Sequence, residues 1–271
     1  MSYKKFVFLF IYTSLLILVA VSPFIVFLIK TKEYATVHEI VNEQIQKKSI
    51  YGTALNNNTF LYKIELINKI KPNIVAMGSS RVMQLREEFF LDSFINTGGA
   101  LNKIEDASIL IHQILKTYKP KIIIFSIDAW WFNENYKTEI PENRNLDTTN
   151  ILFFEKIFNP IKWLIQCKID LKQFINVLFF NNYKNNITNY NNIGISALDS
   201  SSGFRKDGSY FYSNIIFAKN NSKDIKFSDT ISRIEKGNRR FEYGSKISKK
   251  SINELKNILD ICKKNNIKLI L

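Results

Sequence analysis

The chain has 271 residues, 46% of them hydrophobic, which is enough for one substantial core and leaves little room for a second full domain. Its net charge of +14 is spread along the whole chain rather than gathered in one block, so no nucleic acid partner is expected. Two cysteines (Cys167 and Cys262) and two histidines (His38 and His112) exclude a disulfide framework and give a metal site little to build on. We expect no metal and no cofactor.

The N-terminal segment predicts where the protein is located. No charged residue occurs from Phe6 to Ile29, and at 1.5 Å per residue this segment would form a helix of about 36 Å, which can cross a bilayer. Because the apolar run continues past the small residues 20–22, we expect an uncleaved anchor rather than a cleaved signal peptide. Residues 1–5 would be a cytoplasmic tail, and the bulk of this single-pass cell-membrane protein would be extracytoplasmic.

After a juxtamembrane segment, residues 30–71, strand-like and helix-like segments alternate. Apolar runs predict strands at 73–77, 94–96, 121–127 and 267–271. Apolar residues at helical spacing predict helices over 102–118 and 251–264, with capping boxes formed by Asn102 with Glu105 and by Ser251 with Glu254. This order indicates an α/β domain over residues 72–271: a three-layer sandwich with a mostly parallel sheet, of the flavodoxin-like kind.

The alternation stops at about residues 134–204, which we interpret as an insertion. Its segment 160–180 has the composition of an amphipathic helix with interspersed lysines. Two interpretations remain for it. We favour a lid packed on the domain over the cleft, because amphipathic helices usually face a core, and the alternative is a helix lying in the membrane interface.

Three polar segments follow predicted strands: Gly78–Arg81, Asn96–Gly99 and Asp128–Asn133. In a parallel sheet the carboxyl ends of the strands meet at one edge, where ligands bind. A glycine permits a tight turn, and the serine after it then points out of the sheet beside the N–H groups that open the next helix. This arrangement suits an acyl-transfer nucleophile, with a glycine N–H and an asparagine amide as oxyanion donors.

These motifs resemble the SGNH/GDSL hydrolase superfamily, in which a strand is followed by a Gly-x-Ser block and then by blocks that carry a glycine and an asparagine. The resemblance implies that Ser80 is the nucleophile and that Gly99, or its neighbour Gly98, and Asn133 form the oxyanion hole. The likeness is closest to membrane-anchored branches that handle cell-envelope polymers, such as the alginate acetylation proteins and the protein that D-alanylates teichoic acids. Residues 203–209 also resemble a motif of those branches.

The resemblance implies a serine esterase or O-acyltransferase that acts on an envelope polysaccharide or related polymer, with that polymer or an acyl-donor protein as partner. Ser79 stands where the family has an aspartate, and the closing Asp-x-x-His block is missing. Neither His38 nor His112 is expected to reach Ser80 as a base. We therefore expect the missing part of the domain to lie beyond Leu271; the alternative is a non-catalytic, membrane-tethered scaffold that binds polymer or a partner protein.

Other residues of these segments have weaker predictions. Arg81, Trp130 and Trp131 are assigned to substrate binding, although the tryptophans could equally fill the core. Asp128 is expected to fix its loop rather than take part in the chemistry. Ser80 itself could simply cap the helix that follows it.

Overall fold

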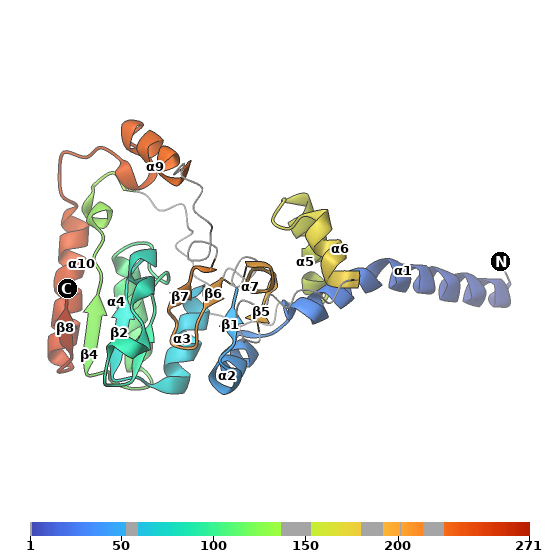
Figure 1. Cartoon of the computed structure of the whole chain (residues 1–271), viewed down its shortest axis with the longest axis horizontal. Helices are drawn as coiled ribbons and strands as arrows, with labels where there is room; N and C mark the ends of the chain where they lie inside the picture. The colour runs from blue at the N-terminus through green and yellow to red at the C-terminus, as the bar shows by residue number, and fades with distance from the viewer. Residues whose placement is uncertain (1, 53–58, 137–152, 180–191, 201, 214–224) are drawn as a thin grey trace.

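The computed structural model describes residues 2–52, 59–136, 153–179, 192–200, 202–213 and 225–271 (Figure 1). Helix α1 (Tyr3–Thr31) projects from an α/β body, and its length and composition are those of a helix that could cross a membrane. The side chains of its apolar stretch are exposed up to Ala20, apart from the partly exposed Val7. The α/β body is therefore attached to the C-terminal end of one apolar helix.

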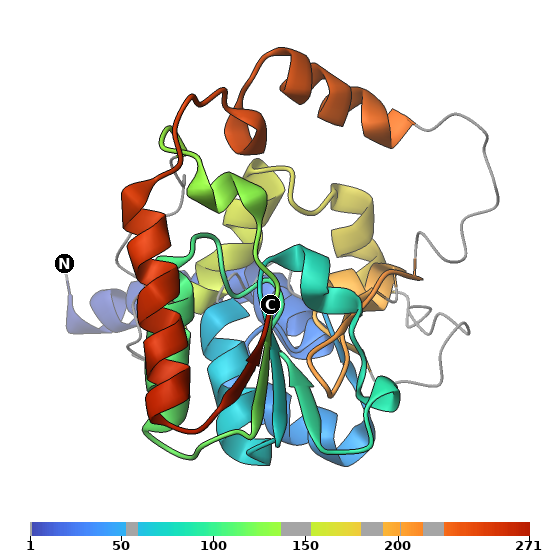
Figure 2. The same ribbon diagram turned by 90° about the vertical axis from the view of Figure 1, so that its left-hand side faces the viewer.

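Sheet B is parallel throughout, in the order β3-β2-β4-β8. Its strands are β2 (Ile74–Met77), β3 (Phe94–Asn96), β4 (Ile122–Phe125) and β8 (Lys268–Ile270). All four coincide with apolar runs predicted from the sequence, so the α/β class and the mostly parallel sheet are confirmed. Because the strands are parallel, their carboxyl ends lie at one edge of the sheet (Figure 2).

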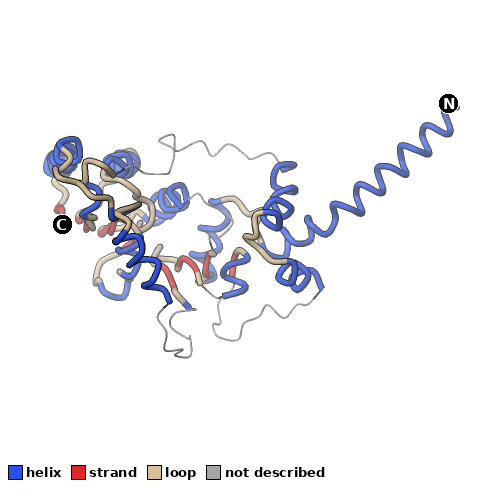
Figure 3. Tube along the Cα trace, turned by 90° about the horizontal axis from the view of Figure 1, so that it is seen from above, coloured by secondary structure: helices blue, strands red, loops and turns tan. Residues whose placement is uncertain are grey.

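Alternate residues of β2 face two different layers. Val75 and Met77 belong to the main core, which also holds buried residues of α3 (Thr59–Ile70), α4 (Glu105–Leu115) and α10 (Lys249–Lys264). These helices lie together on one side of the strands (Figure 3). Ile74 and Ala76 pack instead with Val82 and Phe90. That second layer comes from the 3₁₀ turns η1 (Ser80–Gln84) and η2 (Glu87–Phe89) and their flanks rather than from a long helix.

Helix α4 begins differently from its prediction. The capping box expected from Asn102 and Glu105 does not form, because α4 starts at Glu105 itself. The carboxylate of Asp106 instead accepts hydrogen bonds from the backbone N–H groups of Asn102 and Lys103, at 2.8 and 3.1 Å. One carboxylate therefore holds the turn that leads into the helix.

Helix α10 begins one turn earlier than predicted. Its N-cap is Ser248, whose hydroxyl accepts a hydrogen bond from the N–H of Ser251. The Glu254 carboxylate does not return to the helix start, since it accepts a hydrogen bond from the Ser108 hydroxyl on α4. The predicted capping pair is thus replaced by a true cap three residues upstream and a contact between helices.

A second sheet, A, connects α1 with the main core in the strand order β5-β1-β6-β7. It consists of β1 (Ile50–Tyr51), β5 (Asn192–Ile193), β6 (Gly203–Phe204) and β7 (Tyr210–Phe211), with α2 (Val37–Lys47) and α7 (Ile195–Ser200) beside it. Side chains from residues 30–71, among them Ile40 and Tyr62, belong to the main core. A boundary at residue 72 would divide this core, so the predicted juxtamembrane segment is part of the folded body.

The hairpin formed by β6 and β7 joins sheet A to sheet B through a buried lysine. The Lys63 ammonium on α3 donates hydrogen bonds to the backbone carbonyls of Asn96 and Gly208 and lies 3.8 Å from the centre of the Phe204 ring. Burial lowers the pKa of Lys63, and the charge of Asp207 opposes that shift. Gly208 has φ +77°, and a Cβ there would lie 2.2 Å from the Asn96 carbonyl oxygen.

The predicted insertion contributes a helical hairpin, α5 (Phe153–Ile165) and α6 (Leu171–Phe179), named here the α5–α6 hairpin. The segment 160–180 is thus not one helix, and it does not cover the strand ends. The hairpin packs on the C-terminal part of α1, where Trp163 and Phe174 contact Phe27 and Leu28 (Figures 1 and 3). The prediction of a lid over the cleft is therefore wrong. Towards the C-terminus, α9 (Ile225–Glu235) and η4 (Arg239–Phe241) precede α10.

Candidate functional site

The strand β2 ends in a turn that requires a glycine. A Cβ at Gly78 would lie 2.9 Å from the Cβ of Ser126 and 3.0 Å from its carbonyl oxygen, on the segment that follows β4. The Gly78 carbonyl accepts a hydrogen bond from the N–H of Gly99 at 3.1 Å. Close backbone packing therefore brings the three predicted segments together at the carboxyl edge of sheet B, as the sequence predicted.

The two serines of this turn have different environments. Ser79 is buried, and its hydroxyl accepts a hydrogen bond from the N–H of Arg81 at 3.4 Å, so Ser79 is the residue that caps η1. Ser80 is exposed and is the first residue of η1. The alternative in which Ser80 acts as the cap is thus wrong, and its hydroxyl is available to solvent.

Asp128, three residues after the end of β4 and just before the 3₁₀ turn η3 (Ala129–Phe132), is a buried carboxylate beside the turn of the two serines. Its side chain is fully buried, and the Arg81 Nε lies 3.6 Å from its Oδ1. Burial raises the pKa of Asp128, while the nearby Ser79 hydroxyl and the charges of Arg81 and Arg240 oppose the increase. The carboxylate is placed beneath the exposed turn rather than in contact with bulk solvent.

Two guanidinium groups lie over one tryptophan ring above this carboxylate. The Cζ atoms of Arg81 and Arg240 are 4.5 and 5.2 Å from the centre of the Trp130 ring, within cation–π range. Both arginines are exposed. Ser80, Arg81, Asp128, Trp130 and Arg240 are named here the strand-end cluster, and its outer surface is positively charged.

Trp131 is separate from this cluster. It is buried in the main core, and its ring centre lies 6.1 Å from that of Phe125 on β4. Trp130 is buried in the same core, but its ring also lies against the two guanidinium groups of the cluster, whereas Trp131 fills the core. The assignment of Trp131 to substrate binding is not supported.

The predicted oxyanion donors already have acceptors within the protein. The N–H of Gly99 donates to the Gly78 carbonyl, and the N–H of Gly98 donates to the Asn96 Oδ1 at 2.7 Å. The side-chain amide of Asn133 donates to the Glu242 carbonyl. In this conformation the N–H groups of both glycines are occupied, so the predicted oxyanion hole is incomplete, while the Asn133 amide has two N–H bonds and gives one of them to Glu242.

Asn96 is a residue whose role the sequence analysis missed. It is buried, and its Nδ2 donates to the carbonyls of Val82 and Leu85 at 2.7 and 2.8 Å. Asn96 therefore fixes η1, and with it Ser80, onto the end of β3. A polar residue at the end of an apolar strand was the available signal, but it was interpreted only as part of a turn.

Neither histidine lies near Ser80. His38 is exposed on α2 and pairs with Glu65 at 2.7 Å. His112 is near the C-terminal end of α4, where its Nδ1 lies 2.7 Å from the Ser108 carbonyl. A helix that connects parallel strands runs back from the carboxyl edge, so the C-terminal end of α4 is remote from the cluster.

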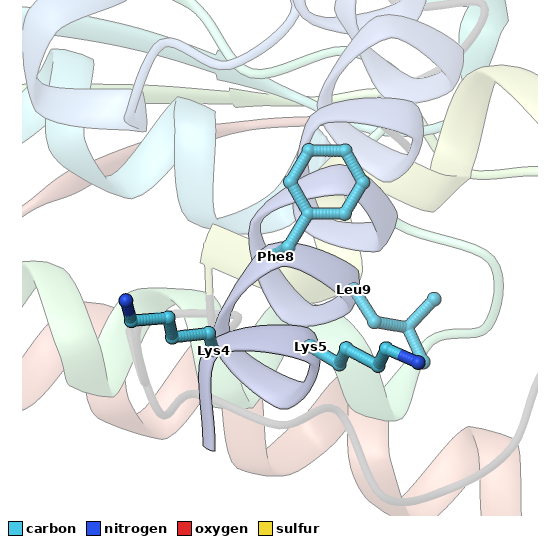
Figure 4. A pocket seen from close by; sticks show the side chains of 4 residues that line it. All are labelled: Lys4, Lys5, Phe8 and Leu9. Carbon is cyan, nitrogen blue, oxygen red and sulfur yellow. The ribbon is translucent and has the colours of Figure 1, made fainter. Parts of the chain in front are cut away.

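Within the described part of the chain, no group of three or more His, Cys, Asp and Glu side chains could hold a metal ion. A hollow on the first turns of α1 is lined by Lys4, Lys5, Phe8 and Leu9 (Figure 4). It lies on the outer surface of one helix, at the opposite end of α1 from the body. The two lysines point to different sides of the helix, as basic residues do at the headgroup level beside a membrane span.

Comparison of the chain with protein-family models, with curated proteins and with solved structures finds no match. The site must therefore be interpreted from its own chemistry. It offers an exposed hydroxyl, a positively charged surface suited to an anionic group, and a buried carboxylate with a raised pKa.

Proposed function

We propose that this protein is a membrane-anchored, SGNH-type serine esterase or O-acyltransferase that acts outside the cytoplasm on a cell-envelope polysaccharide or related polymer. In this proposal the body corresponds to the three-layer, flavodoxin-like domain of that superfamily. Ser80 is the nucleophile, and Arg81 and Trp130 bind the substrate.

One observation carries the proposal: the exposed hydroxyl of Ser80 follows the end of a central parallel strand, in a turn that also holds Arg81 at 3.6 Å from the buried Asp128. Ligands of open α/β sheets bind at this edge. The arginines supply positive charge for an anionic group of the polymer or for an oxyanion. Asp128 acts as a positioning residue, because its charge orients the Arg81 guanidinium beside Ser80.

A serine hydroxyl is a weak nucleophile without a positioned base, and neither histidine is placed to serve as one. Residues at the carboxyl end of β8 would be close to the cluster, because β8 is parallel to β4 and adjacent to it. The proposal therefore assigns the base to neither His38 nor His112. Binding of substrate must also free the N–H of Gly99, which donates to the Gly78 carbonyl.

Covalent labelling with a fluorophosphonate tests the nucleophile. We expect weak labelling of the 271-residue protein at Ser80, and strong labelling in any longer product of the same reading frame that carries an Asp-x-x-His block. There Ser80→Ala should lower activity by about 10³-fold or more, while Ser79→Ala should lower it far less. Labelling of Ser79 with Ser80 untouched, or strong labelling of the 271-residue protein, would contradict the proposal.

A second candidate is a non-catalytic scaffold that uses the same cluster to bind envelope polymer or a partner protein. The occupied N–H of Gly99 favours it, because the predicted oxyanion hole is then incomplete. Binding to immobilised anionic polysaccharide separates the candidates. A scaffold should lose binding in Arg81→Gln and Arg240→Gln, keep it in Ser80→Ala, and show no fluorophosphonate adduct in any form.

The proposal includes a topology in which residues 1–5 are cytoplasmic and everything after about Lys32 is extracytoplasmic. It rests on the apolar helix α1 and its short N-terminal tail. Reporters that are active only in the cytoplasm, or only outside it, are fused after Leu271. A signal from the cytoplasmic reporter alone would overturn both the location and the envelope substrate.

A further inference from the structure

The α5–α6 hairpin exposes an apolar stripe although it is already packed on α1. On α6 the stripe consists of Leu171, Ile175 and Phe179, which are 63%, 40% and 75% exposed. Residues spaced by four lie on one face of a helix, and the opposite face is buried through Phe174 and Val177. On α5, Phe158 and Ile165 are exposed in the same way. The hairpin therefore has two apolar sides, only one of which is covered by the protein.

The position of the hairpin along α1 indicates what covers the second side. It contacts Phe24, Phe27 and Leu28, and the Lys30 ammonium donates to the Leu178 carbonyl in the last turn of α6, at 2.8 Å. These contacts leave α1 free from Phe6 to Pro23, about 27 Å at 1.5 Å per residue. This length is close to the roughly 30 Å thickness of a bilayer's hydrocarbon core. The hairpin thus packs on the last two turns of the predicted span, Phe6–Ile29, where that span would leave the hydrocarbon core.

The charged residues of the α5–α6 hairpin are those expected of a segment at the level of the lipid headgroups. Lys162 on α5, Lys168 in the loop between the helices and Lys172 on α6 are exposed, and so is Asp170 in the loop. Lysines with long apolar stems can keep their ammonium groups among lipid headgroups while neighbouring apolar side chains enter the acyl region. An anionic leaflet would attract these lysines.

We propose that the α5–α6 hairpin lies in the membrane interface, with Leu171, Ile175 and Phe179 inserted in the lipid beside α1. The apolar stripe continues the lipid-facing surface of α1, and this continuity selects a bilayer over a second protein as its occupant. The body would then contact the membrane through both α1 and the α5–α6 hairpin, rather than through α1 alone. The inference rests on the membrane anchoring that is part of the proposed function, and it is independent of the chemistry at Ser80.

Depth-dependent quenching tests the inference with the full chain in vesicles of phosphatidylcholine and phosphatidylglycerol. Single cysteines at Ile175 or Phe179, in a Cys167→Ser background with the buried Cys262 retained, are labelled with an environment-sensitive fluorophore. Lipids brominated near the headgroup should quench both probes and shift their emission to the blue. Lipids brominated near the chain ends should quench them less.

Matched controls separate the possible results. Asn176→Cys, on the polar side of α6, and Leu91→Cys, an exposed apolar position on the body, should remain unquenched. Leu16→Cys, in the middle of α1, should be quenched most by deep bromines. Quenching at Leu16 with none at Ile175 and Phe179 would overturn the inference alone. A blue shift at those positions without quenching would also overturn it, because a protein would then cover the stripe. No quenching at Leu16 would overturn membrane anchoring itself.

Discussion

Two regions of the molecule depart from the usual distribution of side chains in opposite ways. Polar side chains are buried at the carboxyl edge of sheet B, whereas large apolar side chains are exposed on the α5–α6 hairpin. Asn96 and Lys63 are buried, and each is held by hydrogen bonds to backbone carbonyls. Phe179 and Leu171 are exposed although they are apolar. A buried polar group needs partners in fixed positions, so the first region tolerates little change.

The second region has a different constraint. An exposed apolar stripe has no directional partners, and its energy depends on the medium that covers it. The comparison therefore separates two kinds of constraint in one chain. At the strand ends the protein itself fixes the geometry around Ser80, and at the hairpin the surroundings complete the structure. Substitutions in each of the two regions test whether the protein itself or its surroundings fix the local structure.

The largest effect is expected at Gly208. Alanine there would adopt an unfavourable φ of +77° and would place its Cβ 2.2 Å from the Asn96 carbonyl oxygen. We expect Gly208→Ala to lower the free energy of unfolding by about 3 kcal/mol or more. Lys206→Ala is the control, since its exposed pair with Glu87 should contribute less than about 1 kcal/mol. Chemical denaturation in detergent measures both free energies of unfolding. Equal effects of the two substitutions would contradict the role of the β6–β7 turn in joining the two sheets.

The next effect is expected at Asn96. Alanine would leave the carbonyls of Val82 and Leu85 and the N–H of Gly98 without their partner. We expect a loss of about 2–4 kcal/mol in unfolding free energy. Asn96→Ala should also shift the amide NMR signals of η1, whereas Asn257→Ala, at an exposed position on α10, should change both quantities far less. An unchanged η1 spectrum in a folded Asn96→Ala protein would show that this residue does not position Ser80.

A smaller, pH-dependent effect is expected where α1 meets sheet A. Burial raises the pKa of Glu33 from 4.5 to about 7, although the carboxylate accepts a hydrogen bond from the Ile195 N–H, which lowers it. The folded state therefore binds this proton more tightly than the unfolded chain does. Its contribution is fully present below about pH 4.5 and is lost as the pH rises through about 7.

Raising the pH through this window should lower stability by about 2 kcal/mol, less than the full shift implies because Glu33 is only half-buried. Glu33→Gln keeps an oxygen acceptor for Ile195 and should flatten this part of the profile. Glu88→Gln, at an exposed position, is the control and should leave the profile unchanged. Thermal unfolding at a series of pH values measures the profile. An identical slope in Glu33→Gln and the parent protein would assign the dependence to another group.

The sequence was sufficient for the parts of the fold that depend on local pattern. The parallel strands follow from short apolar runs such as 74–77 and 122–125, and α1 follows from a charge-free segment. The start of α10 was placed one turn too late because Ser248 and Ser251 both precede a helical pattern. A serine at either position fits the same capping rule, and only the folded chain distinguishes them.

The site depends on contacts between distant segments, and there the sequence was insufficient. The turn at Ser80 could be predicted from one strand end, but Arg240 reaches Trp130 only because η4 folds back over the strand ends. Asn133 was assigned a free amide, yet the segment after η4 passes beside it and supplies the Glu242 carbonyl. No local pattern encodes which partner a polar side chain will meet across more than a hundred residues.

The smallest effect is expected on the exposed stripe of α6. Ile175→Gln should change the unfolding free energy in detergent by less than about 0.5 kcal/mol, because Ile175 is exposed and does not belong to the buried cluster on α1. Its neighbour Phe174 is 7% exposed, and its ring centre lies 5.0 Å from that of Phe27, so Phe174→Ala should cost about 3 kcal/mol. In vesicles Ile175→Gln should make α6 more susceptible to proteolysis than it is in the parent protein. In detergent the same substitution should hardly change the rate of proteolysis. Equal behaviour of Ile175→Gln in the two media would mean that lipid makes no contribution to holding the hairpin, and the contrast between the two regions would then reduce to packing on α1 alone.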